Sequence, residues 1–396
     1  MLKLLRGPIG FIAISAFLTV MGFTIVIPVL PFIVSEYVPA DRLGLWVGIL
    51  VAVYALCQFI AAPVLGAISD RVGRKPVLLF CLAGSAVGYV IFGVGGALWV
   101  LLLGRVIDGL TGGDISTMFA YVADSAAPED RGRAFGLLGG AAGIGGLAGP
   151  VVGGTVGQLS LSAPLFVAAG VVALSTVWGA FYLPESLPIE RRTARFDARH
   201  LNPLAPFAHV RASRALMALF ATSFLFFCAG TMMQANISVL LKDVLAFGPG
   251  RIGLAVCVLA VVDIFAQGYL SGALLPKLGE KRLAQIGLAI NAVGFLLLAA
   301  LALMPTTALL FVAIVVFNLG DGLFQPAFNA IVSNAAPDSR QGQVQGASQG
   351  IQSVGRVVGP LVVAAVYTLG ASLPYLIGAA LVAGGLMILL SSRPDD

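Results

Sequence analysis

Charge is the scarcest property of this 396-residue sequence. Asp, Glu, Lys and Arg make up 10% of its residues and apolar residues 59%, and the mean hydropathy is +1.00. Soluble globular domains contain about 25% charged residues, so the composition excludes an ordinary soluble protein. Apolar runs of about 20 residues, which can span a bilayer as helices, recur from end to end. We therefore expect an all-α membrane protein.

Cysteine and histidine are also scarce. The four cysteines fall in apolar runs without the paired spacing of a disulfide framework or a metal site. Both histidines, His200 and His209, lie in a polar stretch. We therefore expect no metal and no cofactor, and a proton site inside the membrane would have to use carboxylates.

Other absences exclude whole classes of function. A GxxxxGK[ST] phosphate-binding loop is absent, which argues against a nucleotide-driven pump. The net charge of +5 is spread over short loops without a basic face, so we expect no nucleic-acid partner. We expect a small-molecule substrate, the lipid bilayer as a partner, a functional monomer and no enzymatic activity. A membrane receptor or an intramembrane enzyme is the alternative from another class.

Apolar runs divide the chain into two sets. The first set covers 8–34, 44–69, 77–94, 99–125, 134–158 and 164–183. The second set covers 215–240, 251–276, 283–303, 308–335, 344–370 and 374–391. These runs predict twelve transmembrane helices, with an N-terminal six-helix half at 1–183, a linker at 184–214 and a C-terminal six-helix half at 215–396.

The loops between the runs alternate in charge. One side collects nearly all the Lys and Arg residues, including those of both chain ends and the linker, whereas the other side has Arg42, Lys242 and Arg251. The positive-inside rule places the basic side in the cytoplasm. We expect a multi-pass protein of the bacterial inner membrane with both termini in the cytoplasm.

The two halves repeat one another. The segment "AGPVVGG" at 148–154 matches "VGPLVVA" at 358–364. Likewise, "IDGL" at 107–110 matches "GDGL" at 320–323. Repeated halves of transporters enclose a site near the membrane midplane and expose it to alternate sides as they rock. The repeat therefore predicts two pseudo-symmetric halves around a central site.

The turn "GAISDRVGRKP" at 66–76 concentrates charge between two predicted helices. Its glycines permit a tight turn, and an acid at the end of the fourth run is a candidate partner for Arg71 or Arg74. We interpret this group as a conformational latch; a solvated turn with a simple helix-end acid is the alternative. The latch consists of Gly66, Asp70, Arg71, Gly73, Arg74 and Asp124.

Glycines crowd the fifth run, "GLLGGAAGIGGLAGPVVGG". Small residues at helical spacing allow close helix contact in a membrane, and a proline adds a kink or hinge. A simple packing seam is the alternative to a functional motif here. The residues concerned are Gly145, Gly149, Pro150, Gly153 and Gly154. The first run has Pro28 and Pro31, which predict a broken helix.

Four acids lie deep in predicted spans, namely Asp108, Asp114, Asp263 and Asp321. An Asp at the centre of a spanning helix costs about 2.5 to 3.5 kcal/mol, which suggests that these residues have a role. Asp114 has no arginine on its helix face, and a lone carboxyl in a low dielectric holds a proton more readily. We expect Asp114 and Asp108 to be the first candidates for proton coupling, followed by Asp263 and Asp321.

Two arginines are candidate partners for these acids. Arg105 lies three residues before Asp108 and shares its helix face. Arg356 could pair with Asp321 in the second half. Structural salt bridges that only hold helices together are the alternative, since breaking a buried pair is destabilising whatever its role.

Polar, aromatic and methionine side chains within the spans are candidates for the substrate cavity, although ordinary helix packing explains any one of them. They are Tyr54, Gln58, Met118, Phe119, Gln234, Asn236, Asn318, Gln325 and Asn329.

Several of these motifs carry a family resemblance. The 66–76 turn resembles the signature loop "GxLaDrxGrkp" of the major facilitator superfamily. Residues 143–154 are similar to the antiporter motif "GxxxGPxxGG", residues 22–31 to the pattern "GxxxxxPvxP", and residues 103–113 to the fourth-helix motif that contains Arg105. The resemblance covers the whole chain and points to the tetracycline-exporter-like branch of the twelve-helix drug:proton antiporters. It implies the major facilitator fold and proton-coupled efflux.

Departures from the resemblance bear on the substrate. Tetracycline exporters carry acids in the first, third and ninth helices, where this chain has Thr19, Gly88 and Asn291. Asp108 replaces the glutamine of the fourth-helix motif, and Asp263 replaces a histidine of the eighth helix. These changes argue against tetracycline as the dedicated substrate and support a coupling role for Asp263.

The expected function is proton-coupled secondary transport that exports amphipathic, drug-like molecules by alternating access, with protons as the coupling ion. Export of a physiological metabolite, such as a sugar, an amino acid or a lipid, is the alternative within transport.

Overall fold

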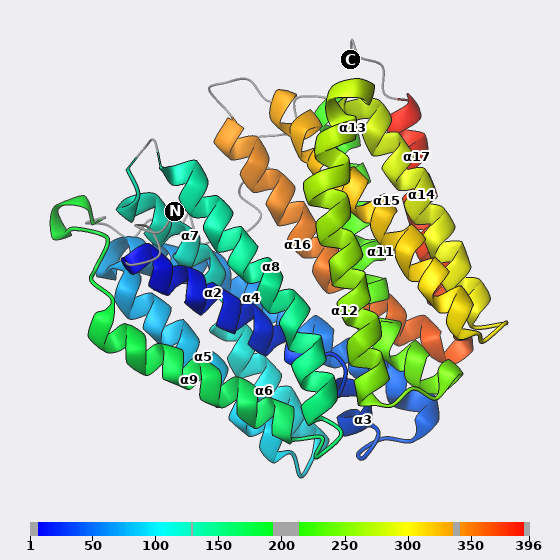
Figure 1. Ribbon diagram of the computed structural model, residues 1–396, viewed down its shortest axis with the longest axis horizontal. Coiled ribbons are helices and arrows are strands. Elements are labelled where there is room, and N and C mark those ends of the chain that lie inside the picture. Colours follow the sequence, from blue (N-terminus) through cyan, green and yellow to red (C-terminus); the bar gives the residue numbers. More distant parts are fainter. Residues whose placement is uncertain (1–6, 128–129, 193–213, 336–340, 392–396) are drawn as a thin grey trace. The chain divides into compact units, whose positions relative to one another are not determined.

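The computed structural model describes residues 7–127, 130–192, 214–335 and 341–391 (Figure 1). Within these ranges the regular structure is helical and contains no strand. Most of the predicted linker, 193–213, lies outside the described residues, as do the two ends of the chain that carry the topology prediction.

Helices in the first half follow the predicted apolar runs closely. They are α2 (Pro8–Ile25), α3 (Leu30–Val34), the 3-10 turn η1 (Ala40–Arg42), α4 (Leu43–Val72), α5 (Arg74–Val94), α6 (Leu98–Leu110), α7 (Asp114–Ser125), α8 (Arg131–Val156), α9 (Ala163–Tyr182) and the 3-10 turn η2 (Ile189–Arg191). The break between α2 and α3 lies at Pro28, as the two prolines of this run predict.

Helices in the second half do the same. They are α11 (Arg214–Leu245), α12 (Pro249–Phe265), the π-helical turn η4 (Ala266–Leu270), α13 (Ser271–Leu278), α14 (Glu280–Leu301), α15 (Thr307–Asn334), α16 (Gln341–Val366), the 3-10 turn η6 (Tyr367–Leu369) and α17 (Leu373–Ser391).

Eleven helical segments of the described chain are long and apolar enough to cross a membrane. The twelfth predicted span, 99–125, is not one helix, because α6 ends at Leu110 and α7 begins at Asp114. Each of the two pieces is too short to span a bilayer alone. The fourth predicted span is therefore present as two consecutive helices.

The chain forms two compact units. The N-terminal unit comprises 1–37, 53–203 and 248–257, and the C-terminal unit comprises 38–52, 204–247 and 258–396. Each unit thus takes one short segment from the other half of the sequence. The predicted division at the linker, 184–214, stays a prediction.

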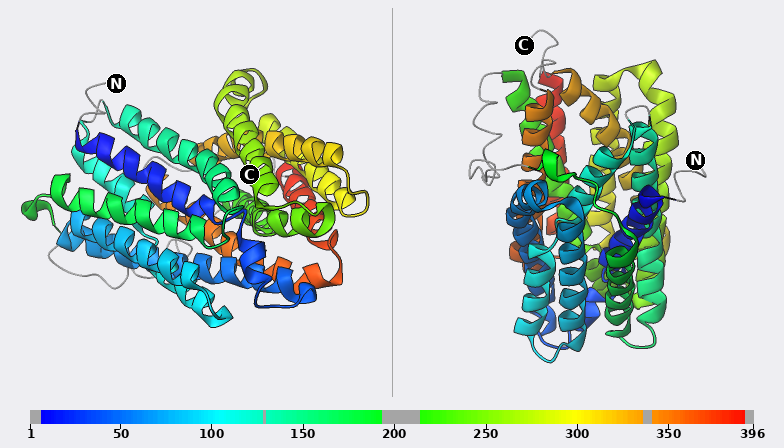
Figure 2. Two further views of the ribbon diagram at one scale, coloured as in Figure 1. Left: turned by 60° about the horizontal axis from the view of Figure 1, so that its bottom comes forward. Right: turned by 90° about the vertical axis from the view of Figure 1, so that its left-hand side faces the viewer.

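Equivalent helices pack in equivalent pairs within the two units. In the N-terminal unit, α2 packs on α8 and α9, and α5 packs on α6 and α9. In the C-terminal unit, α11 packs on α16 and α17, and α14 packs on α15 and α17. Figure 2 shows α2 and α8 side by side from two further directions. The repeat predicted from the sequence is thus a repeat of packing as well.

Candidate transport site

The fourth membrane segment is broken at residues 111–113. Two adjacent glycines, Gly112 and Gly113, favour a turn over helix at this point. Asp114 therefore becomes the first residue of a new helix, α7, where the aligned backbone dipoles favour a negative charge. The sequence predicts a role for Asp114 but not its place at a helix start, for which the Gly-Gly-Asp sequence is the signal.

Asp114 is buried and its closest polar contacts are uncharged. Its Oδ1 accepts a hydrogen bond of 2.9 Å from the backbone N–H of Ile115. Thr19 of α2 lies beside the carboxylate. The start of α7 holds this carboxylate, so its stabilisation comes from the helix backbone.

Arg105 and Asp108 form a buried pair on α6. Arg105 Nη1 lies 3.6 Å from Asp108 Oδ2, and the guanidinium carbon lies 4.8 Å from the ring centroid of Phe92 and 5.8 Å from that of Tyr54. The pair predicted from the sequence spacing is therefore present, whereas its role in coupling stays a prediction. Neither Arg105 Nε nor Asp108 Oδ2 makes a hydrogen bond within the described chain.

Gly88 of α5 lies directly against Asp108. A Cβ built on Gly88 would lie 2.9 Å from the Cβ of Asp108. Gly88 and Thr19 are two of the positions where the family resemblance implied an acid. Each of them thus adjoins an acid, Asp108 or Asp114, that the α6–α7 segment supplies.

The two deep acids of the C-terminal unit, Asp263 and Asp321, are paired with amides. Gln267 Nε2 donates to both carboxylate oxygens of Asp263 at 2.9 Å, and Gln325 Nε2 donates to Asp321 Oδ2 at 2.6 Å. Both pairs have i,i+4 spacing, which brings side chains together on a helix. Because α15 packs on η4, the helix that carries Asp321 packs against the turn that carries Gln267.

Asn291, the third departure from the resemblance, lies in the same region. Gly320 of α15 approaches the backbone and Cβ of Asn291 so closely that a side chain would not fit there, and Gly320 directly precedes Asp321. Arg356 lies 5.8 Å from the ring centroid of Phe227. The predicted pairing of Arg356 with Asp321 stays a prediction.

Tyr54 and Gln58 connect α4 to the broken helix. Gln58 Nε2 donates to the hydroxyl of Tyr54 at 3.2 Å and to the carbonyl of Gly112 at 3.1 Å. The amide of Gln58 thus satisfies a carbonyl that the break leaves outside a regular helix. Both residues were predicted to be substrate-cavity candidates, and Tyr54 lies beside Arg105.

The other cavity candidates divide by exposure. Those buried in their own unit are Met118, Asn236 and Asn318. Those that are exposed are Phe119, Gln234 and Asn329. A substrate role for any of them stays a prediction, and the exposed set has side-chain surface free for contact.

The latch is centred on Arg74. Its Nη1 lies 2.6 Å from Asp70 Oδ1, and its Nε lies 2.9 Å from Asp124 Oδ2. Of the two arginines considered as partners of Asp124, Arg74 is the one in contact. Gly73, with φ of +118°, directly precedes α5, and a left-handed backbone of this kind favours glycine. The other arginine, Arg71, is exposed.

A carboxylate that sequence analysis did not select completes the latch. Glu185 Oε1 accepts a hydrogen bond of 2.8 Å from the N–H of Arg74, and Oε2 accepts one of 3.2 Å from the N–H of Lys75. Glu185 is therefore the acid that accepts hydrogen bonds from the first N–H groups of α5. No local pattern predicts this contact, because Glu185 lies 111 residues from Arg74 in the sequence.

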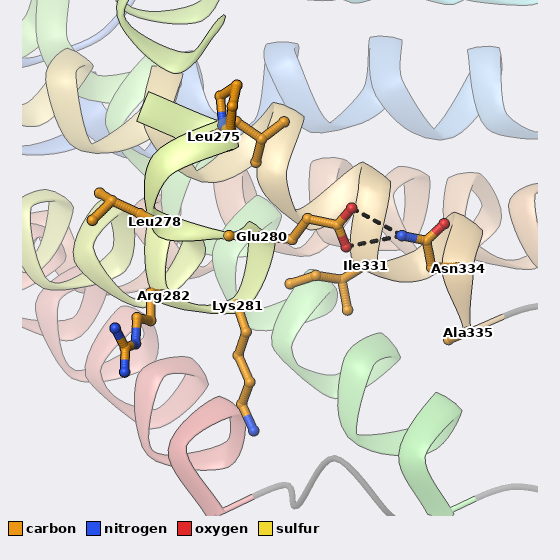
Figure 3. Close-up of a pocket in the computed structure, with 10 residues that line it drawn as sticks. Leu275, Leu278, Glu280, Lys281, Arg282, Ile331, Asn334 and Ala335 are labelled. Atoms are coloured by element: carbon orange, nitrogen blue, oxygen red, sulfur yellow. Dashed lines mark hydrogen bonds between the residues drawn. The ribbon is translucent and has the colours of Figure 1, made fainter. Parts of the chain in front are cut away.

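The matching turn of the C-terminal unit is built differently (Figure 3). Gly279, with φ of +73°, precedes α14, and both carboxylate oxygens of Glu280 accept hydrogen bonds from Asn334 Nδ2 at 2.9 and 3.0 Å. Lys281 and Arg282 point away from this pair. A cavity of about 810 Å³ lies between the turn and the end of α15.

Glycines of the antiporter-like motif make close helix contacts. A Cβ on Gly145, Gly149 or Gly153 would clash with α2, and a Cβ on Gly154 would crowd the first turn of α12. These contacts all lie within the N-terminal unit. Pro150 lies inside the continuous helix α8. The motif therefore provides the packing seam that small residues predict, and its contribution to antiport stays a prediction.

Comparison with known families agrees with this geometry. The sequence matches the family model described as Major Facilitator Superfamily over residues 12–360 and 229–395. The chain belongs to the major facilitator superfamily. Helical structure, repeated packing and the signature turn at 66–76 are therefore features of one fold, as the sequence predicted.

Named relatives of this major facilitator protein include antibiotic resistance proteins. The class C tetracycline resistance protein of Escherichia coli is 36% identical over 368 residues, which cover 92% of this chain and 91% of that protein. Multidrug resistance protein 2 of Bacillus subtilis is 28% identical over 391 residues, which cover 96% of this chain and 94% of that protein. The crystal structure of the human organic anion transporter MFSD10 is similar to this one with a TM-score of 0.71 at 23% sequence identity. The match covers 96% of this chain and 98% of that chain. The chain is thus a multi-pass membrane transporter of the tetracycline-exporter-like branch.

Proposed function

We propose that this chain exports amphipathic, drug-like molecules from the cytoplasm in exchange for protons. It would do so by alternating access, binding substrate from inside and releasing it outside after an acid within the membrane takes up a proton. Each proton that enters contributes about 2.3 kcal/mol per 100 mV of membrane potential. The names of its relatives, tetracycline and multidrug resistance proteins, support this direction of transport.

The observation that carries the proposal is the position of Asp114. Burial favours its neutral form, whereas the N-terminus of α7 favours its charged form. A carboxylate balanced in this way can accept and release a proton without leaving a buried cation unpaired. Protonation of Asp108, whose partner is Arg105, would change the net charge of that pair. This protonation would depend on whether substrate occupies the site.

The positions of Asp114 and Asp108 relative to the acids of the family pattern also support coupling. The resemblance implies acids where this chain has Thr19, Gly88 and Asn291. Thr19 adjoins Asp114 and Gly88 adjoins Asp108. A proton site can keep its place in space while its carboxylate moves from one helix to the next, because protonation depends on where the group lies and not on which helix carries it.

The transporter would lie in the bacterial inner membrane. Both termini and the linker would be in the cytoplasm, as the distribution of Lys and Arg favours. The protein would work as a monomer without a cofactor, and protons would be the coupling ion.

Transport assays in proteoliposomes with an imposed pH gradient test the function. We expect cationic dyes, tetracyclines or chloramphenicol to release protons and to accumulate only while the gradient lasts. Asp114→Asn should abolish gradient-driven accumulation but retain substrate exchange between equal concentrations, since exchange needs no net proton movement. Asp130→Asn, which removes a carboxylate of an exposed ion pair, is the matched control and should leave both activities intact.

Two results would overturn the proposal. Gradient-driven accumulation that survives in Asp114→Asn would move the coupling site elsewhere. A purified protein that moves no member of the drug panel, but moves a sugar, an amino acid or a lipid with protons, would identify a metabolite exporter. Tetracycline is included because the relatives are tetracycline resistance proteins, although the departures at Thr19, Gly88 and Asn291 argue against it as the dedicated substrate.

A further inference from the structure

Glu185 connects the segment after α9 to the first turn of α5. Its carboxylate accepts hydrogen bonds from the backbone N–H groups of Arg74 and Lys75 at 2.8 and 3.2 Å, and from that of Leu187 at 3.0 Å. Arg192 Nη2 lies 3.9 Å from its Oε2. Both carboxylate oxygens of Glu185 therefore have partners, although Glu185 lies in the segment after α9 and in neither α9 nor α5.

The start of α5 needs an acceptor from elsewhere. The first N–H groups of any helix lack partners within the helix, and the residue before α5, Gly73, has no side chain that could cap it. Glu185 approaches so closely that a Cβ on Gly73 would clash with its Oε2. Gly73 is thus required both by its left-handed backbone and by the space that the carboxylate occupies.

Arg74 is held at both ends. Its backbone N–H binds Glu185, while its side chain binds Asp70 and Asp124. The position of its Cα, which Glu185 helps to fix, decides whether the guanidinium reaches Asp124 at the end of α7. Glu185 therefore acts on the latch through the main chain of Arg74.

The segment that carries Glu185 is itself anchored. The hydroxyl of Tyr121 on α7 donates to the carbonyl of Pro184 at 2.8 Å, and Lys75 Nζ donates to the carbonyl of Ala180 at 2.9 Å. Leu183 is 1% exposed. A shift of this segment would consequently be passed to α5 and α7 together.

The turn of the C-terminal unit differs at the glycine itself. Gly279 has the same kind of left-handed backbone before α14, yet no side chain or distant segment that the structure describes comes within 4 Å of a Cβ built there. The close approach of a carboxylate to the glycine, present at Gly73, is therefore not repeated at Gly279 among the described residues.

We infer that Glu185 is a positioning residue for transport, which holds the first turn of α5 so that Arg74 closes the latch on Asp124. The inference rests on the proposed function, because the latch is read out through transport. Opening the latch would require the segment 184–192 to release α5, so the connection into the linker would share control of the conformational change.

Kinetics of Glu185→Gln test the inference. The amide keeps the size of the side chain but replaces charge-assisted hydrogen bonds by weaker neutral ones, so we expect the maximal transport rate to fall about tenfold with little change in KM. Glu185→Asp should recover part of the rate. Glu190→Gln, which changes an exposed glutamate in the same segment, is the matched control and should transport like the wild type.

A double mutant separates positioning from general stability. Asp124→Asn and Glu185→Gln act on the same arginine, so the double variant should be no slower than the slower single variant. Multiplicative losses, or a Glu185→Gln variant with a wild-type rate, would overturn the inference.

Hydrogen–deuterium exchange gives a readout that does not depend on the substrate. In Glu185→Gln we expect faster exchange at the first turn of α5 and unchanged exchange at the matching turn of α14. If no drug is transported but exchange changes as expected, the proposed function fails while the positioning role stands. Unchanged exchange at α5 would reject the role of Glu185 itself.

Discussion

The two units build the same helix packing but hold their acids in different ways. In the N-terminal unit the partners are cations: Asp108 faces Arg105, Asp124 faces Arg74, and Glu185 faces Arg192. In the C-terminal unit three acids have amide partners: Asp263 faces Gln267, Asp321 faces Gln325, and Glu280 faces Asn334. A fourth acid, Asp243, accepts a hydrogen bond of 3.0 Å from the hydroxyl of Tyr367.

This difference has an energetic consequence. A carboxylate paired with an arginine leaves a buried positive charge when it is protonated, which is costly. An amide can donate to a carboxylate or accept from a carboxylic acid, so its partner can gain a proton without stranding a charge. Two units with the same helix packing can therefore differ in how easily their acids change charge.

Asp114 is the exception in the N-terminal unit, and exchanging it with Thr19 sharpens the comparison most. Asp114→Thr should abolish proton-driven accumulation completely. Because Thr19 adjoins Asp114, the exchange Thr19→Asp with Asp114→Thr should restore a substantial part of it. Proton release upon substrate addition in proteoliposomes measures both. A double variant as inactive as the single one would show that the start of α7, and not the location alone, is required.

Removing one partner from each kind of pair tests the comparison directly. Arg105→Ala should destabilise the protein by about 3 to 5 kcal/mol because it leaves Asp108 buried without its cation. Gln325→Ala should cost about 1 to 3 kcal/mol, the range for an unsatisfied hydrogen-bonding group. Thermal midpoints in detergent measure the difference, and Arg105→Ala with Asp108→Ala should recover much of the loss. Equal losses for the two single variants would remove the distinction between the units.

Packing should respond equally in the two units, in contrast to charge. A Cβ on Gly149 would clash with Thr24 Oγ1, and one on Gly359 would clash with Thr231 Oγ1. Gly149→Ala and Gly359→Ala should each cost about 1 to 3 kcal/mol through overpacking. Gly140→Ala and Gly346→Ala, whose Cβ atoms would meet nothing within 4 Å, are the controls. Thermal midpoints that fall in only one unit would contradict the symmetry of the seams.

The smallest effect is expected at the turn of the C-terminal unit. The hydrogen bonds between Asn334 and Glu280 are exposed, so Asn334→Ala should change the free energy of unfolding by no more than about 0.5 kcal/mol. Asp124→Asn should instead slow transport measurably because it weakens the contact with Arg74. Transport rates of the two variants in proteoliposomes measure this difference. If Asn334→Ala transported more slowly than the wild type, both units would contain a latch.

Helix positions were predictable because the apolar runs that cross a membrane are set by composition and length. The i,i+4 pairs of Asp263 with Gln267 and Asp321 with Gln325 follow from helical periodicity, although sequence analysis did not pair them. Glu185 could not be predicted, since its partners are brought to it by the return of α9 past α5. The break before Asp114 was hidden because Gly-Gly within an apolar run is tolerated in membrane helices.

The π-helical turn η4 determines how the span that contains it responds to a deletion. Such a turn accommodates one residue more than an α-helix would use, and Gly268 within it is exposed, with room around it. Deleting Gly268 would therefore leave the flanking helices α12 and α13 in phase. Deleting a residue from an uninterrupted helix such as α15 would instead rotate every later side chain by about 100°. The span from Pro249 to Leu278 can thus change its length by one residue while it keeps its faces.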